Sequence, residues 1–312
     1  MIIDMHAHVF TEAALKKLRN QYGEYIPRLT QNQPEFYDAR KRIAMMDERG
    51  VGAQVLSVTP GNFCYAVPPE VGIAISQTQN DAIHDMVIEN PDRFIGSATV
   101  PLQDPEAAVQ ELDRAVKDLS FTSVEIGTNV NGANLDSPVL EPFYDKTEAL
   151  GVPIIVHPIN NAGADRMTRY YLGNTVGNPA ETTLAIGSVI FGGVTERHKE
   201  LSFCWVHGGG FLPYQIGRLD HGYRVREEAR ANIMKPPHGY LDKMYFDTIT
   251  HNEPALVFLI KQMGADKVLY GTDFPWDMGE YDSIPMIKGM NSLLDEERAK
   301  VLGENSYRLF QA

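Results

Sequence analysis

The sequence has few cysteines and few basic residues for its length. Only two of its 312 residues are cysteines, and one of them, Cys204, lies within an apolar run, so a disulfide framework is not indicated. Lysine and arginine number 28 against 41 aspartates and glutamates, a formal net charge of -13. A nucleic-acid surface needs a basic stripe that releases counterions from phosphates, and an anionic membrane attracts basic segments. We therefore expect a cytoplasmic protein with no nucleic-acid partner and no membrane partner.

Long apolar runs, targeting segments and linkers are also missing. Asp4 interrupts the first apolar run, so no signal peptide is predicted. The most apolar later stretch, 183–194, contains glycines and is too short to span a bilayer. No G-x-G-x-x-G follows the first apolar run, which leaves a dinucleotide-binding fold without support. With no Gly/Ser-rich linker or internal repeat, the chain is expected to form one domain over residues 1–312.

Short β-like runs alternate with helix-like stretches along the whole chain. Asp104 and Pro105 begin one predicted helix, and Asn252 begins another that Gly264 ends. Eight such strand–helix units predict an α/β fold, a closed parallel (β/α)₈ TIM barrel, with an open doubly wound sheet as the competing architecture. Two longer connections, 11–38 and 160–182, are expected to be active-site loops. The strands are expected at 2–5, 54–58, 94–100, 122–126, 153–156, 202–206, 244–249 and 267–270.

Histidines and an aspartate stand at the carboxyl ends of several predicted strands. In the opening stretch MIIDMHAHVF, His6 and His8 are two residues apart, so in a strand they point to the same face. The fifth, sixth and eighth predicted strands lead to His157, His207 and Asp273. In a parallel barrel these ends all face one mouth, which is where such enzymes have their active sites.

Four imidazoles and one carboxylate at one mouth predict a site for a divalent metal. These donors suit Zn²⁺, Mn²⁺ or Fe²⁺ better than Ca²⁺ or Mg²⁺, and three histidines with one aspartate leave a position for water, which is typical of a catalytic site. The fourth strand end offers Glu125 and no lysine, so one metal is expected rather than two bridged by a carbamylated lysine. His251 either lines the mouth or caps the following helix. The other histidines are interpreted as ordinary polar residues: His84, His198, His221 and His238.

The spaced motifs IDMHAH, VHP, VHGGG and YGTDFPW resemble those of the metal-dependent amidohydrolase superfamily. Longer blocks, such as NPDRFIGSATVPLQDPE and NPAETTLAIGSVIFGGV, are similar to its nonhydrolytic decarboxylases, in particular the α-amino-β-carboxymuconate-ε-semialdehyde decarboxylases. The resemblance implies one metal ion, zinc or in some relatives manganese, with His207 as the acid/base group beside it. It also implies that Arg218 binds a carboxylate in the active site of a neighbouring subunit, and hence a homodimer. The metal ligands implied are His6, His8, His157 and Asp273.

The segments that select the substrate depart from the family pattern. The arginine- and lysine-bearing stretch of the family's first long loop is shortened here, and Arg28 is the one candidate to replace it. Tyr171 stands where the family has a tryptophan, so we expect Tyr171 and Arg218 to shape the substrate pocket. These departures leave the individual substrate unassigned.

Together these features predict a metal-dependent decarboxylase that acts on a small unsaturated or aromatic carboxylic acid. Breaking the bond to a carboxylate is easiest when the carbon that keeps the electrons is protonated, and His207 titrates in the right range to move that proton. We predict that Asp273, like His207, is a catalytic residue. Two alternatives stay open: a metal-dependent hydrolase of a lactone or amide, or a hydratase of an oxo-diacid, both using the same activated water, and a barrel that binds its metal only for stability.

Overall fold

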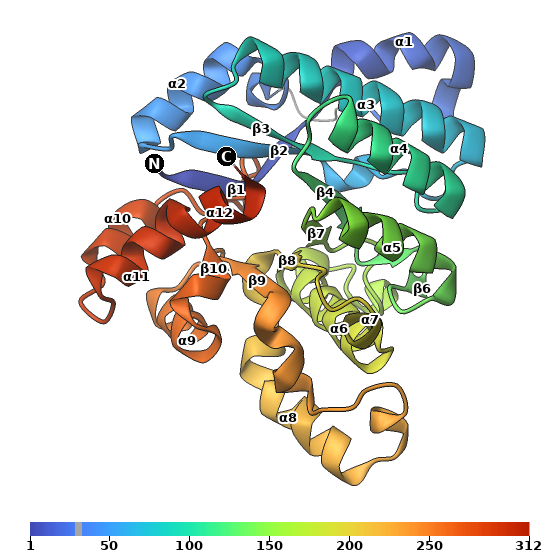
Figure 1. Ribbon diagram of the computed structural model, residues 1–312. Coiled ribbons are helices and arrows are strands. Elements are labelled where there is room, and N and C mark those ends of the chain that lie inside the picture. The colour runs from blue at the N-terminus through green and yellow to red at the C-terminus, as the bar shows by residue number, and fades with distance from the viewer. Residues whose placement is uncertain (29–32, 312) are drawn as a thin grey trace.

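Eight parallel strands curve around one axis (Figure 1), in the computed structural model that describes residues 1–28 and 33–311. This arrangement confirms the predicted (β/α)₈ barrel over the open sheet. The predicted loop 11–38 and the predicted domain 1–312 include residues 29–32 and 312, which lie outside the described residues. In spatial order the strands are β1 (Ile3–Val9), β2 (Ala53–Val58), β3 (Phe94–Ala98), β4 (Ser123–Gly127), β7 (Ile154–His157), β8 (Phe203–Trp205), β9 (Met244–Asp247) and β10 (Val268–Leu269).

Hydrogen bonds between β1 and the segment after β10 close the barrel. The backbone N–H of Met5 donates to the carbonyl of Tyr270 at 2.9 Å, and the N–H of Asp273 donates to the carbonyl of His6 at the same distance. Because the last strand pairs with the first in parallel, the residues that follow β10 lie beside the carboxyl end of β1. Closure therefore brings Asp273 against His6.

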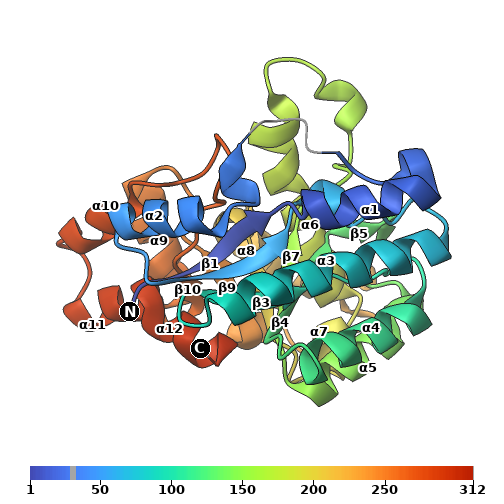
Figure 2. The ribbon, with the colours of Figure 1, turned by 90° about the horizontal axis from the view of Figure 1, so that it is seen from above.

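Helices surround the strands, and α1 lies beside α3 on the outside of the molecule (Figure 2). The side chains of Asp104 and Asn252 cap their helices as predicted, each accepting a backbone N–H of the first turn at 3.1 Å. β5 (Asn129–Val130) and β6 (Ala133–Asn134) form a small antiparallel pair. The α-helices are α1 (Glu12–Tyr22), α2 (Ala39–Arg49), α3 (Pro69–Glu89), α4 (Pro105–Lys117), α5 (Glu141–Leu150), α6 (Asn178–Phe191), α7 (Val194–Arg197), α8 (Leu212–Val225), α9 (Glu253–Met263), α10 (Ser283–Gly289), α11 (Asp295–Ala299) and α12 (Asn305–Phe310).

The barrel interior is packed with apolar side chains from strands all around the barrel. Ile3 and Met5 of β1 cluster with Ile155 of β7 and Leu269 of β10, and Phe310 of α12 joins them. The pairing of β1 with β2 shifts register between Asp4 and Ala7. Side chains along a strand alternate between its two faces, and this irregularity shifts the alternation by one residue. Met5 therefore points into the barrel, and so do His6 and His8 after it.

The two predicted active-site loops contain regular structure. Helix α1 occupies the first part of 11–38, and further along that segment the ring of Phe36 packs against Trp276, with 4.9 Å between ring centroids. The second connection, 160–182, contains a π-helix at Gly173–Gly177 that continues into α6. Both cysteines are free. Within residues 1–28 and 33–311, every helix is too short or too polar to cross a bilayer.

Candidate metal centre

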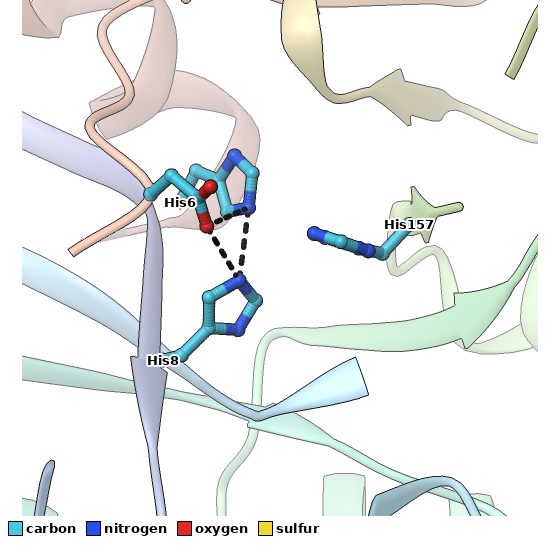
Figure 3. Close-up of side chains that lie close together, drawn as sticks. His6, His8 and His157 are labelled. Carbon is cyan, nitrogen blue, oxygen red and sulfur yellow. Dashed lines mark hydrogen bonds and ion pairs between the residues drawn. The ribbon is translucent and has the colours of Figure 1, made fainter. Parts of the chain in front are cut away.

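Three histidines and one aspartate converge at the carboxyl end of the barrel (Figure 3). His6 and His8 come from β1, His157 is the last residue of β7, and Asp273 follows β10. One ligand atom of each residue lies within 4.8 Å of the other three, and all four residues are buried. The Nε2 atoms of His6 and His8 are 3.0 Å apart, and Oδ1 of Asp273 lies 3.4 Å and 3.1 Å from them.

The outer nitrogen of each imidazole is held by an oxygen acceptor. A carboxylate or carbonyl oxygen can only accept, so each Nδ1 carries the proton and each neutral ring keeps a lone pair on Nε2. The acceptors are Oδ2 of Asp247 for His6 at 2.8 Å, the carbonyl of Val58 for His8 at 3.0 Å and the carbonyl of Pro158 for His157 at 3.1 Å.

This arrangement of donors fits a divalent cation. Two imidazole lone pairs that face each other at 3.0 Å repel unless a cation lies between them. Oδ1 of Asp273 is buried and, within the described residues, accepts no hydrogen bond, which is costly for a carboxylate oxygen. Imidazole and carboxylate donors suit Zn²⁺ or Mn²⁺. The mouth of the barrel therefore contains a divalent-metal site.

The electrostatics of the site keep three of the four donors in the protonation states that a metal needs. The exception is His8, where burial lowers the pKa but the neighbouring Asp273 carboxylate raises it above its usual value. Burial lowers the pKa of His6 and lowers that of His157 well below its usual value. Burial alone would raise the pKa of Asp273, but His6 and His207 outweigh it and hold that pKa well below its usual value. Ligating histidines must be neutral and a ligating carboxylate ionised, so these shifts prepare the site for metal binding.

His207 stands beside this group without belonging to it. Its Nε2 is 3.6 Å from Oδ2 of Asp273, and although burial lowers the pKa of His207, the Asp273 carboxylate raises it above its usual value. The residue begins the turn HGGG, in which the following glycines all have positive φ. Gly210 is required there, because a Cβ would lie 2.2 Å from the carbonyl oxygen of Pro179 in α6.

A cavity of about 510 Å³ opens above His207 and Asp273. Its other lining residues include the apolar side chains of Phe211, Ile249 and Phe258. The volume and the mixture of apolar walls with a few polar groups are typical of a small-molecule site.

Asp247, at the end of β9, connects the metal-facing and cavity-facing parts of the site. Its Oδ2 accepts from Nδ1 of His6 at 2.8 Å and from the backbone N–H of His207 at 2.9 Å, while Oδ1 accepts from the N–H of Gly208 at 2.7 Å. Asp247 was not among the predicted site residues, because it lies inside the seventh predicted strand. Its position near the end of that strand, at the same mouth, was the available signal.

The chain is similar to known proteins over nearly its whole length. A model of the amidohydrolase family matches residues 3–312. The chain belongs to the amidohydrolase family. It is 40% identical, over 86% of its length and 76% of the relative's, to 2-amino-3-carboxymuconate-6-semialdehyde decarboxylase of Dictyostelium discoideum. Two solved structures are similar at 25% identity. One is a dihydroxybenzoic acid decarboxylase of Polaromonas sp. with manganese and the inhibitor 2-nitroresorcinol; the TM-score is 0.84, and the match covers 99% of this chain and 96% of that chain. The other is a 5-carboxyvanillate decarboxylase of Novosphingobium aromaticivorans with manganese and 4-hydroxy-3-methoxy-5-nitrobenzoic acid; the TM-score is 0.86, and the match covers 100% of this chain and 96% of that chain.

These similarities confirm the predicted superfamily and the predicted enzyme class. This amidohydrolase is a metal-dependent decarboxylase, and the hydrolase or hydratase alternative is not favoured.

Two residues predicted to bind substrate lie outside the cavity of this amidohydrolase. Arg218 is exposed on α8 and, in the part of the chain that the structure describes, makes no ion pair or hydrogen bond. Tyr171 is 57% exposed, and partial burial, with the carboxylates of Asp277 and Asp273, raises the pKa of its hydroxyl. Neither side chain lines the cavity above His207. A single chain therefore does not bring Arg218 to the reacting groups.

The remaining histidines divide into two groups. His251 lines the cavity. His84, His198 and His238 have hydrogen-bond partners away from the metal site, namely the carbonyl of Leu119 and the carboxylates of Glu141 and Asp220, and His221 is exposed on α8.

Glu125, the acidic residue at the fourth strand end, is fully buried near the metal site. Burial raises its pKa to about 7, while the charge of His8 and a hydrogen bond from the Ser57 side chain act in the opposite direction. Glu125 therefore retains a proton over much of the range in which a free glutamate is ionised.

Proposed function

We propose that this decarboxylase acts on a small aromatic or unsaturated carboxylic acid and replaces its carboxylate by a proton. The observation that carries the proposal is the set of three Nε2 lone pairs and one carboxylate beside His207, at the base of a cavity of about 510 Å³. The two similar structures that contain substituted aromatic rings as ligands support the substrate class.

The proposed ligands of the metal are His6, His8, His157 and Asp273. We propose zinc as the metal, with manganese as the second candidate, because the donor set suits both and two similar structures contain manganese. When bound, the metal supplies a Lewis acid that polarises an oxygen of the substrate.

His207 is the proposed proton donor. The bond between carbon and carboxylate breaks with its electron pair left on carbon, and carbon dioxide departs. A proton from His207 then takes the place of the carboxylate on that carbon, so that a carboxylate anion and a proton give the shortened product and CO₂. Asp273 keeps the pKa of His207 raised, and Asp247 holds the backbone of His207 in place.

The proposed carboxylate-binding residues are Arg218 and Tyr171, with Arg218 reaching the site of the partner subunit in a homodimer. Helix α8 projects away from the barrel (Figure 1), and Arg218 on it is exposed. A planar guanidinium binds a carboxylate through two parallel hydrogen bonds. The inactive His207→Ala and Arg218→Ala proteins should regain part of their activity when they form verified mixed dimers. An absence of recovery would show that Arg218 does not act in the site of the partner subunit.

The two free cysteines support a reducing compartment, and we propose that the protein is located in the cytoplasm.

The function is tested by following CO₂ release from a panel of aromatic and muconate-type acids. The purified protein is stripped of metal and reloaded with Zn²⁺ or Mn²⁺. We expect metal-dependent CO₂ release from at least one acid, with activity reduced by at least about 100-fold in His207→Ala. His221→Ala, which removes an exposed histidine, is the matched control and should keep full activity.

Two outcomes would overturn the proposal. One is CO₂ release that does not depend on His207. The other is an absence of CO₂ from every acid, together with ring opening of lactones or hydration of oxo-diacids.

A further inference from the structure

The wall of the cavity carries a second histidine that the mechanism above does not use. His251 follows β9 and lines the same cavity as His207 and Asp273. Capping of α9 does not explain this residue, because the side chain of Asn252 is the cap and accepts the N–H of Ala255 at 3.1 Å. The sequence leaves two roles open for His251, lining the mouth of the barrel or capping the following helix, and the structure supports the first.

A largely buried carboxylate holds His251. Its Nδ1 lies 3.3 Å from Oε2 of Glu280, whose side chain is only 15% exposed. The backbone N–H of Glu280 donates to the carbonyl of Thr272 at 2.9 Å, and Thr272 precedes Asp273. His251 is thus tied to the loop that supplies the aspartate of the metal site.

The conformation of His251 also indicates a fixed position. Its φ of 53° is in the left-handed region, which only a few per cent of non-glycine residues adopt, histidine more often than most. Such a conformation persists where the surroundings determine it, and it is frequent at ligand-binding positions. With Nδ1 facing Glu280, Nε2 is the nitrogen left to bind a ligand, and among the described residues it has no hydrogen-bond partner.

We propose that His251, oriented by Glu280, is a second recognition subsite of the cavity. It binds an oxygen substituent of the substrate, a ring hydroxyl or a second carboxylate, while the carboxylate that leaves faces His207 and Asp273. The neighbouring wall residues Ile249, Phe258 and Leu259 are apolar and suit the ring or chain between the two ends. This inference rests on the proposed function, because that function identifies the group near His207 and Asp273 as the carboxylate that leaves. It predicts that preferred substrates carry an oxygen substituent at the opposite end as well.

The subsite is tested by binding in a background that does not turn over. In metal-loaded His207→Ala protein, calorimetry compares benzoate with 3-hydroxybenzoate and with isophthalate, which add one hydroxyl or one carboxylate. We expect at least one of the two substituted ligands to bind tighter than benzoate by about tenfold or more, the size of one hydrogen bond that involves a charged group. Adding His251→Leu should remove this preference and change the affinity for benzoate by less than about threefold.

Two further variants sharpen the test. Glu280→Gln keeps the size of the side chain but removes its charge, and it should reduce the same preference by a smaller factor. His238→Leu is the matched control, because His238 forms an exposed pair with Asp220, Nδ1 to Oδ2 2.9 Å, outside the cavity. It should leave all three affinities unchanged.

The outcomes separate the subsite from the proposed reaction. The proposed subsite would be wrong if all three ligands bound with equal affinity, or if His251→Leu reduced the affinity for all three by the same factor. A preference that depends on His251 would support it even if no acid in the panel released CO₂, a result that would count against the proposed function alone.

Discussion

At the scale of single residues, the site is prepared by hydrogen bonds on the side of each imidazole that faces away from the metal position. Nδ1 of His6 donates to Asp247, and the same carboxylate accepts the backbone N–H groups of His207 and Gly208. One buried carboxylate thus sets both the direction of the Nε2 lone pair of His6, a proposed metal ligand, and the start of the HGGG turn. Partners of this kind orient metal ligands and raise their affinity.

Replacing Asp247 by asparagine should therefore weaken metal binding and proton transfer together. An amide has one acceptor oxygen and a donor NH₂ group, so it cannot accept all of the N–H groups that now face the carboxylate. We expect metal affinity, measured by competition with a chelator, to fall by about 10–100-fold. Asp242→Asn, at an aspartate that is 86% exposed, is the control and should leave the affinity unchanged. An Asp247→Asn protein with normal metal affinity would contradict this role.

Glu125 predicts a pH dependence of stability in the metal-free protein. Its pKa is about 7 in the folded chain against an ordinary value of 4.5, so between these values the folded state holds a proton that the unfolded state has lost. The contribution of Glu125 to stability therefore falls as pH rises from about 4.5 to 7, by roughly 3 kcal/mol in total. Glu125→Gln should remove this loss and be more stable than the original protein at pH 8 by about that amount.

Denaturant unfolding of the metal-free proteins at pH 5 and pH 8 measures this effect. Glu89→Gln, which changes an exposed glutamate of α3, is the control and should follow the original protein at both pH values. The account of Glu125 would be wrong if the difference in unfolding free energy between Glu125→Gln and the original protein were the same at pH 5 and pH 8.

At the scale of secondary-structure elements, the sequence predicted the ends of strands better than the contacts between them. His6 and His8 were predicted to share a face because the spacing of two in a strand is local information. The irregularity in β1 that turns both Met5 and His6 inward depends on its pairing with β2, which no local pattern encodes. The position of Asp247 near a strand end could have been noticed in the sequence, but its role as an acceptor for His6 and His207 depends on contacts between distant segments.

The turn after β8 is the element on which the position of His207 depends most directly. Gly210 has a φ of 62°, and a Cβ there would lie 2.2 Å from the carbonyl oxygen of Pro179. Gly210→Ala must therefore move either the turn or α6, and we expect a loss of about 2 kcal/mol or more of unfolding free energy. The activity should fall as well, since His207 begins the same turn.

Gly289→Ala is the matched control for this prediction. Gly289 ends α10 and has open space around the position of a Cβ, so alanine there should leave the stability within about 0.5 kcal/mol of the original. Denaturant unfolding and decarboxylase assays of both variants provide the measurement. A Gly210→Ala protein that matched Gly289→Ala in both would show that the close approach to α6 is not limiting.

At the scale of the whole molecule, closure of the barrel and formation of the metal site are the same event. His6 and His8 come from the first strand, His157 from the middle of the chain and Asp273 from the segment after the last strand. These residues converge only when the hydrogen bonds between β1 and the segment around Tyr270 and Asp273 close the sheet. An unfolded chain has no such site, so metal binding should favour the closed barrel over every opened state.

Metal removal should accordingly destabilise the entire molecule. With free metal at about 1,000 times its Kd, binding contributes about 4 kcal/mol, and for a chain of this size we expect the unfolding temperature to fall by roughly 5–10 °C when a chelator removes the metal. His8→Ala should lose most of this metal-dependent difference, whatever its own stability, because it removes one of the converging lone pairs. His238→Ala should keep the full difference. Thermal unfolding of the original protein and both variants, with metal and with chelator, measures this difference in unfolding temperature. If His8→Ala kept the full difference, the stabilising ion would bind somewhere other than the mouth of the barrel.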